Sequence, residues 1–94
     1  MIYHVSLSAS ARKRLKKLRY SGNFNTEVFH RILRCLENGE PLPERTKDHQ
    51  LHGEFANYRE CHLGFNLLLL YKRNDEARVV TISDIGTHGE LFGE

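Results

Sequence analysis

Apolar and polar positions alternate at the start of the chain and then change to helical spacing. The alternation in IYHVSLS (residues 2–8) predicts a strand with one apolar face. From Ala11 to Leu18 the apolar residues recur at helical spacing, which predicts a helix with its polar residues on the other side. Ser8 or Ser10 can cap this helix, because a serine oxygen accepts a hydrogen bond from a free backbone N–H of the first turn.

A second helical pattern fits residues 26–38, after the break SGN at 21–23. Asn25 or Thr26 can cap this helix, and its apolar residues form one stripe that we expect to be buried. Gly39 suits the left-handed conformation that ends many helices. We expect the two helices to form a hairpin that covers one face of a sheet.

Three strand patterns follow a loop at residues 40–53. They are Phe55–His62, which is mixed polar and aromatic, Phe65–Lys72, which is the most apolar, and Ala77–Ile85, which is rich in β-branched residues. The order β-α-α-β-β-β predicts an α+β fold, with a two-helix hairpin packed on a four-stranded, mainly antiparallel sheet. The first strand joins this sheet at an edge or inside it. We expect residues 1–94 to form a single domain.

The composition fits a soluble cytoplasmic protein, with 39% hydrophobic and 28% charged residues. The apolar run at 67–71 is too short to span a membrane. The first residues contain no apolar stretch ahead of a cleavage site, so no signal peptide is indicated. Cys35 and Cys61 form no close pair, which is typical of reduced thiols in the cytoplasm.

The charge is distributed unevenly, although the net charge is only +2. The segment ARKRLKKLR at 11–19 contains no acidic residue, and its basic residues are Arg12, Lys13, Arg14, Lys16, Lys17 and Arg19. Such a segment can bind phosphates or an acidic partner segment through counterion release and electrostatic steering. The plain alternative is a solvated helix face.

The segment KDHQLHGEFANYRECHLG (47–64) contains His49, His52 and His62, three of the six histidines of the chain. Structural zinc usually needs four ligands at recognised spacings, and this segment contains no such spacing. Adjacent Cys61 and His62 on a strand point to opposite faces, which disfavours a shared metal ion. We therefore expect no metal and no cofactor.

Acid–base cleavage of RNA fits these residues better than metal binding. Attack by the RNA 2′-hydroxyl on the neighbouring phosphate needs a base, an acid and cations, which two imidazoles and a basic side chain can supply. His49, His62 and His88 lie on a loop, at a strand end and in a C-terminal turn, and they can converge if the strands pair as predicted. For each histidine taken alone, a surface position is the alternative.

The segments LPERTKDHQLHGEFANYRECHLG, LLLLYKRNDEARVVTI and GTHGELFG, within residues 42–93, resemble the YafQ-type branch of the RelE/ParE superfamily. Members of this branch are toxins of type II toxin–antitoxin systems. The resemblance implies a metal-independent endoribonuclease, or mRNA interferase, that cuts mRNA in the ribosomal A site and contacts ribosomal RNA. It also implies inhibition by an antitoxin, a small dimeric DNA-binding protein through which the complex reaches operator DNA.

The resemblance assigns site residues position by position. His88, in GTH, is implied as a general acid or base, and His49 and His62 share base duty, substrate orientation or charge stabilisation. Phe92 is implied to stack on or position a base, with anchoring of the C-terminus as the alternative. Asn66 stands where relatives carry an aspartate, and it can form hydrogen bonds but cannot take a proton. His52 matches no such position and is interpreted as a surface residue, and Cys61 as a packing residue.

One further departure concerns the cation of the site. Asp84 stands where active relatives usually carry an arginine, and loss of one charge-stabilising group can cost about 10²–10³ in rate. Lys47, Arg59, Lys72 or Arg78 can substitute for it. Together with the basic segment, the first three are our candidates for contacts with RNA, the ribosome or the antitoxin.

Two other functions remain open from the sequence. In one, the chain is a catalytically weakened module that mainly binds its antitoxin and co-represses its operon. In the other, it acts on DNA gyrase like the ParE class, which is disfavoured because that class lacks the histidine set.

Overall fold

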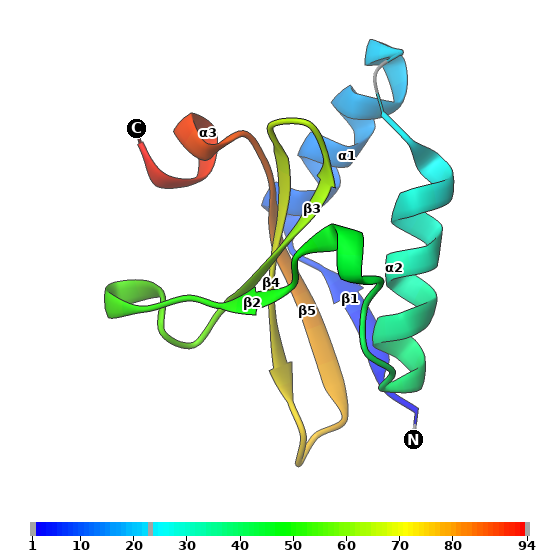
Figure 1. The fold of residues 1–94 in the computed structure, drawn as a ribbon, viewed down its shortest axis with the longest axis vertical. Helices are drawn as coiled ribbons and strands as arrows, with labels where there is room; N and C mark the ends of the chain where they lie inside the picture. The colour runs from blue at the N-terminus through cyan, green and yellow to red at the C-terminus, as the bar shows by residue number, and fades with distance from the viewer. Residues whose placement is uncertain (1, 23, 94) are drawn as a thin grey trace.

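A computed structural model describes residues 2–22 and 24–93 of the chain (Figure 1). The elements in chain order are β1 (His4–Leu7), α1 (Ala9–Ser21), α2 (Thr26–Asn38), the 3₁₀ turn η1 (Glu44–Thr46), β2 (His49–Gln50), the 3₁₀ turn η2 (Gly53–Phe55), β3 (Arg59–Gly64), β4 (Leu67–Asn74), β5 (Val79–Gly86) and α3 (His88–Phe92). The predicted α+β fold, with two helices ahead of a run of strands, is confirmed.

The five strands form one sheet in the order β1-β5-β4-β3-β2. β1 runs parallel to β5 at one edge, and every other neighbouring pair is antiparallel. Figure 1 shows α1 and α2 on one side of the sheet, and α3 on the side away from them. The two faces of the sheet therefore have different surroundings, which is central to the site described below.

Side-chain caps determine where both long helices begin. The Ser8 hydroxyl accepts from the Ala11 N–H at 3.0 Å and donates to the Ser83 carbonyl at 2.6 Å, which ties the start of α1 to β5. Asn25 caps α2 by accepting from its third residue, and Gly39 ends α2 with a φ of 67°. A left-handed φ of this kind is favourable for glycine, as the sequence predicted.

The core lies between the helix pair and the sheet. Its buried residues are Tyr3, Ala11, Phe29, Ile32, Leu36, Cys61, Leu63, Leu69, Tyr71, Val80, Ile82 and Ile85. Cys61 is fully buried, so its predicted packing role is confirmed, and burial raises the pKa of its thiol. Cys35 is half-buried, and both thiols are free.

Three predicted strand boundaries are wrong for local reasons. The strand predicted at Phe65–Lys72 begins only at Leu67, because Asn66 has a φ of 54° in the preceding turn. The strand predicted at Phe55–His62 begins only at Arg59, because Gly53 adopts a φ of 66° and starts the turn η2. The strand predicted from Ala77 begins at Val79, because Arg78 has a φ of 56° in the preceding turn.

Two elements were missed altogether. β2 lies in the predicted loop 40–53, and it makes the sheet five-stranded where four strands were predicted. The glycine-rich tail forms α3, whose first turn is held by a capping box. The Thr87 hydroxyl accepts from the Glu90 N–H at 3.2 Å, and the Glu90 carboxylate accepts from the Thr87 N–H at 2.9 Å. No helix of the described residues is long and apolar enough to cross a membrane.

Replacing Ile32 by alanine tests the position of the core. Ile32 is fully buried on α2, so Ile32→Ala should lower the free energy of unfolding by about 2–5 kcal/mol through lost burial and a residual cavity. The same change at Ile2, which is 77% exposed, should alter it by less than about 0.5 kcal/mol. Chemical denaturation of both variants measures the difference, and equal losses would contradict this core.

Candidate active site

Strand pairing brings the predicted histidines to the face of the sheet opposite α1 and α2. His49 of β2 lies directly across from Glu60 of β3. His62 is two residues beyond Glu60 on the same strand and therefore shares its face. His88 is the first residue of α3, and its Nε2 lies 4.0 Å from Oε1 of Glu60. We call this side of β2, β3 and β4 the histidine face.

Glu60 is the residue that the sequence analysis missed. Its side chain is only 6% exposed, whereas that of His88 is 49% exposed. A buried carboxylate is costly unless it is paired, and the His88 ring is a partner 4.0 Å away. The sequence could have indicated Glu60 through the alternation of side chains along β3, which puts Glu60 on the same face as His62.

A hydrogen bond orients the ring of His49. Its Nδ1 lies 2.7 Å from the carbonyl oxygen of Lys47. A carbonyl only accepts, so this contact requires the proton on Nδ1 and leaves Nε2 of the neutral ring free to accept a proton. Lys47 has a left-handed φ of 51°, and it lines a cavity of about 300 Å³ together with His62. The lining of this cavity also includes Asn25 and Val28, so it reaches the side of the sheet that α2 covers.

Aromatic contacts hold α3 over the histidine face. The ring of Phe92 packs edge-on against Phe55 with centroids 5.0 Å apart, and it lies 6.2 Å from the ring of His88. Phe55 also lies 6.2 Å from the ring of Tyr58, over which the Lys72 ammonium sits at 5.6 Å. The contact with Phe55 matches the anchoring alternative for Phe92, while its proposed stacking on RNA stays a prediction.

The turn before α3 explains the glycine of GTH. A Cβ at Gly86 would lie 3.0 Å from Oε1 of Glu90, too close for any larger residue without a shift of that side chain. Arg14 of α1 donates to the other oxygen of Glu90. Backbone hydrogen bonding at Thr87, followed by the charge of Arg14, lowers the pKa of Glu90. Glu90 therefore links α1 to the helix that carries His88.

The two departures from the family pattern have local explanations. Asn66 is exposed in the β3–β4 turn with a φ of 54°, a conformation that asparagine tolerates. The carboxylate of Asp84 accepts from the Ser10 hydroxyl at 3.2 Å and from the Ile85 N–H at 2.9 Å. Asp84 is thus bonded at the start of α1, where the helix dipole favours a negative charge.

The predicted cationic residues fall into three groups. Arg12, Lys13, Lys16 and Lys17 are exposed on α1, whereas Arg14 is paired with Glu90. Lys47 and Lys72 are exposed. Lys72 lies on the histidine face, because residues two apart on a strand share a face, and Leu68 and Leu70 pair with His62 and Glu60.

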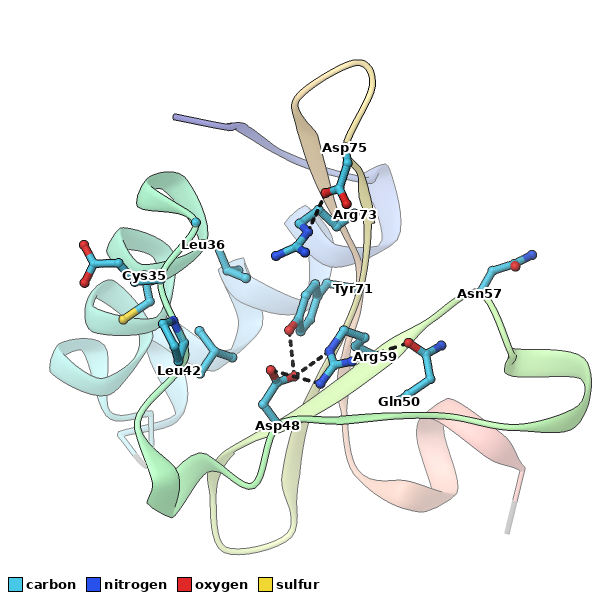
Figure 2. A pocket seen from close by; sticks show the side chains of 13 residues that line it. Cys35, Leu36, Leu42, Asp48, Gln50, Asn57, Arg59, Tyr71, Arg73 and Asp75 are labelled. Atoms are coloured by element: carbon cyan, nitrogen blue, oxygen red, sulfur yellow. Dashed lines mark hydrogen bonds and ion pairs between the residues drawn. The ribbon is translucent and has the colours of Figure 1, made fainter. Parts of the chain in front are cut away.

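Arg59 is not brought to the histidine face. Its guanidinium is bonded to Asp48 on the helix-facing side of the sheet, in a cavity of about 420 Å³ (Figure 2). Burial alone would lower the pKa of Arg59. Hydrogen bonds to Asp48 and Tyr71 outweigh this effect and raise the pKa above its usual value. Arg59 therefore differs from the free cations, and a role in partner contact stays a prediction.

Among residues 2–22 and 24–93, no group of three or more histidine, cysteine or acidic side chains is placed to hold a metal ion. His52 is exposed at the start of η2, in agreement with its interpretation as a surface residue.

Comparison with known proteins identifies the class. Over residues 3–93 the chain matches the profile of the family described as the bacterial toxin of type II toxin–antitoxin systems, YafQ. Fold and match together place the chain in the class of type II toxins. Within that class, the chain belongs to the YafQ family.

Named relatives agree with this assignment. The mRNA interferase toxin YafQ of Escherichia coli (strain K12) is 32% identical over 89 residues, covering 95% of this chain and 84% of that protein. A Haemophilus influenzae protein that carries the YafQ name is 38% identical over 60 residues, covering 62% of this chain and 59% of that protein.

Solved structures agree as well. A metal-bound toxin from Helicobacter pylori has a TM-score of 0.86 and 32% identity, covering 98% of this chain and 100% of that chain. YafQ in the E. coli DinJ–YafQ toxin–antitoxin complex has a TM-score of 0.84 and 28% identity, covering 99% of this chain and 100% of that chain.

The lowered pKa of Glu90 predicts that the hold on α3 weakens in acid. A carboxylate whose pKa is lowered by folding stabilises the folded state. This stabilisation is complete above the ordinary pKa of glutamate, 4.5, and is lost as the pH falls through the lower pKa of the folded state. The protection factors of amides 86–92, measured by NMR exchange against the intrinsic rate at each pH, should therefore fall in this acidic range. Glu90→Gln should remove most of this pH dependence, and Glu76→Gln, an exposed control in the β4–β5 turn, should retain it. Unchanged pH dependence in Glu90→Gln would contradict the assignment.

Proposed function

We propose that the chain is an endoribonuclease toxin that cleaves mRNA in the ribosomal A site by metal-independent acid–base chemistry. The observation that carries the proposal is the placement of three histidines on one sheet face, with His88 beside the buried Glu60. The name of the E. coli relative, an mRNA interferase, supports the same activity.

The proposed step uses only groups of the chain and of the RNA. A histidine takes the proton of a 2′-hydroxyl, whose oxygen forms a bond to the adjacent phosphorus. The bond from phosphorus to the 5′-oxygen breaks, and a second histidine gives that oxygen a proton. The products are a 2′,3′-cyclic phosphate end and a 5′-hydroxyl end, so no water or metal is consumed.

We assign roles according to position. His88 is the residue on which we place the general acid or base, because its Nε2 lies 4.0 Å from Oε1 of the buried Glu60. The free Nε2 of His49 suits it to accept a proton, and His62 shares this duty or orients the phosphate. Lys47 and Lys72 supply positive charge for the phosphorane, and Asn66 and Phe92 contact the RNA.

The proposed regulation follows the E. coli complex. A cognate antitoxin, a DNA-binding dimer, binds and inhibits the chain, and the complex reaches operator DNA only through the antitoxin. The DinJ–YafQ complex supports this partner class. The exposed basic face of α1, defined as Arg12, Lys13, Lys16 and Lys17, contacts ribosomal RNA or an acidic antitoxin segment.

A weakened antitoxin-binding module is the second candidate. The absence of an arginine at Asp84 and the turn position of Asn66 favour it. Tight binding of the antitoxin without cleavage of mRNA on ribosomes would select this candidate. Inhibition of supercoiling by the purified chain would instead indicate action on DNA gyrase.

His88→Ala should lower ribosome-dependent cleavage by about 10²–10⁴, the usual contribution of one acid–base group. Single-turnover cleavage of mRNA on programmed ribosomes, read by primer extension, measures this loss. The control is His52→Ala, which removes an exposed histidine of the same segment and should leave the rate within about twofold. Thermal unfolding checks that both variants fold. A His88→Ala variant that cleaves like the unaltered chain refutes the assigned role.

Removing charge from the basic face should identify its partner. Replacing Arg12, Lys13 and Lys16 by glutamine should reduce the salt slope of log Kd by roughly 2, because single-stranded nucleic acid releases about 0.7 counterion per contact. Binding to ribosomes and to the antitoxin is measured separately. Arg31→Gln with Arg34→Gln, on the exposed surface of α2, is the control. Unchanged slopes for both partners would exclude the basic face from either contact.

A further inference from the structure

The strand that carries His49 is held by very little backbone pairing. β2 consists of two residues at the edge of the sheet, paired as His49 with Glu60 and Gln50 with Arg59. After β2, the Leu51 N–H continues the backbone pairing, donating to the Tyr58 carbonyl at 3.0 Å. So short an edge strand needs side-chain contacts to keep its position.

Two side chains supply these contacts. Within β2, Nε2 of Gln50 donates to the Tyr58 carbonyl at 2.9 Å and to the Ala56 carbonyl, and Asp48, the residue before β2, bonds to β3 and β4. Its Oδ1 accepts from the Tyr71 hydroxyl at 2.6 Å and from Nε of Arg59 at 3.2 Å. Its Oδ2 accepts from Nη2 of Arg59 at 3.3 Å. Figure 2 shows the Asp48 carboxylate pointing toward both partners, and all three residues line the cavity on the helix side of the sheet. One carboxylate thus joins the start of β2 to β3 and β4, and we call these three residues the Asp48 clamp.

The partners of Asp48 are themselves fixed. Tyr71 is buried in the core, where burial and then the hydrogen bond to Asp48 raise the pKa of its phenol. Arg59 is directly paired with Tyr71 in the β3–β4 ladder, and its Nη1 donates to Oε1 of Gln50 at 3.4 Å. Two-point hydrogen bonding between an arginine and a carboxylate fixes orientation as well as distance.

The Asp48 clamp lies directly behind the proposed catalytic groups. Asp48 precedes His49, and Arg59 precedes Glu60, so alternation puts each clamp residue on the opposite face from its reactive neighbour. A displacement of Asp48 therefore moves His49 relative to Glu60. Misplacement of a reacting group by about 1 Å can cost 10²-fold in rate.

We propose that Asp48 is a positioning residue for the ribonuclease, because its bonds to Arg59 and Tyr71 hold β2 in register and set His49 against Glu60. This inference rests on the proposed function. It gives the aspartate of KDH and the arginine of YRE one shared task, behind the histidine face instead of on the RNA.

The chain contains a matched control for the Asp48 clamp. Asp75 lines the same cavity and accepts from the Tyr3 hydroxyl at 2.9 Å and from Nε of Arg73 at 2.8 Å. It is likewise an aspartate bonded to one tyrosine and one arginine, but it lies in the β4–β5 turn, away from β2 (Figure 2). The Asp75 side chain is 67% exposed and that of Asp48 is 22% exposed, so Asp75→Asn controls for the chemistry of the cluster, without releasing β2, and does not match its burial.

The test compares these variants in single-turnover cleavage on programmed ribosomes. Asp48→Ala should lower the rate constant of cleavage by roughly 10–100-fold with little change in the ribosome concentration at half-saturation. Asp48→Asn and Tyr71→Phe, which each keep part of the clamp, should give smaller losses. Asp75→Asn should stay within about twofold of the unaltered chain.

A double-mutant cycle separates positioning from a general loss of stability. If Asp48 acts through His49, then adding Asp48→Ala to His49→Ala should lower the rate by less than about twofold further. A full second loss in the double variant, or unaltered cleavage by Asp48→Ala alone, would overturn the proposal.

Amide exchange keeps the inference testable if the unaltered chain cleaves no mRNA. That result would refute the proposed function, and the Asp48 clamp would then be judged by NMR exchange rates at residues 49–51. Faster exchange in Asp48→Ala than in Asp75→Asn supports the clamp. Equal exchange in the two variants overturns it.

Discussion

The alternation of side chains along β3 is the constraint on which the site depends. Within four residues, Arg59 and Cys61 face the helices while Glu60 and His62 face away from them. A slip of one residue in register would bury His62 and expose Cys61. The cross-strand pairs Cys61–Leu69 and Glu60–Leu70 fix this register, because Leu69 belongs to the core between sheet and helices. Packing on one face therefore sets the chemistry of the other.

Local patterns predicted the parts of the fold that local forces determine. The bounds of α2 follow from the cap at Asn25 and the stop at Gly39, and both are readable in the sequence. The capping box of α3 was readable too, since Thr87 and Glu90 have its spacing, but the surrounding glycines indicated a turn instead. β2 could not be predicted in this way, because a two-residue strand has no periodicity. Its position comes from β3 and from the bonds of Asp48 to Tyr71, which lies 23 positions away.

The candidate site shows the same division. Resemblance placed His49, His62 and His88 in one site, and the structure puts them on one face. The resemblance gave no reason to single out Glu60, because the partner of that carboxylate is His88, which lies on an element that the sequence predicted to be a turn. Arg59 was classed as a free cation because a sequence does not reveal ion pairs between strands. The burial of a charge depends on its partner, and here the partner is Asp48.

The position of Arg59 alters the electrostatics of the proposed reaction. With Arg59 bonded to Asp48 and aspartate at position 84, the proposed site relies on Lys47, which lines a cavity with His62, and on Lys72, which lies over the Tyr58 ring. An ammonium is a compact point charge without the planar fork by which arginine fixes a phosphate at two points. Lys47 and Lys72 can neutralise a phosphorane, but they restrict its orientation less than an arginine would. Orientation then rests on the histidines, and therefore on how firmly β2 and α3 are held. A different carboxylate holds each element, Asp48 for β2 and Glu90 for α3. The positions of β2 and α3 therefore both depend on ion pairs that lie outside the histidine face.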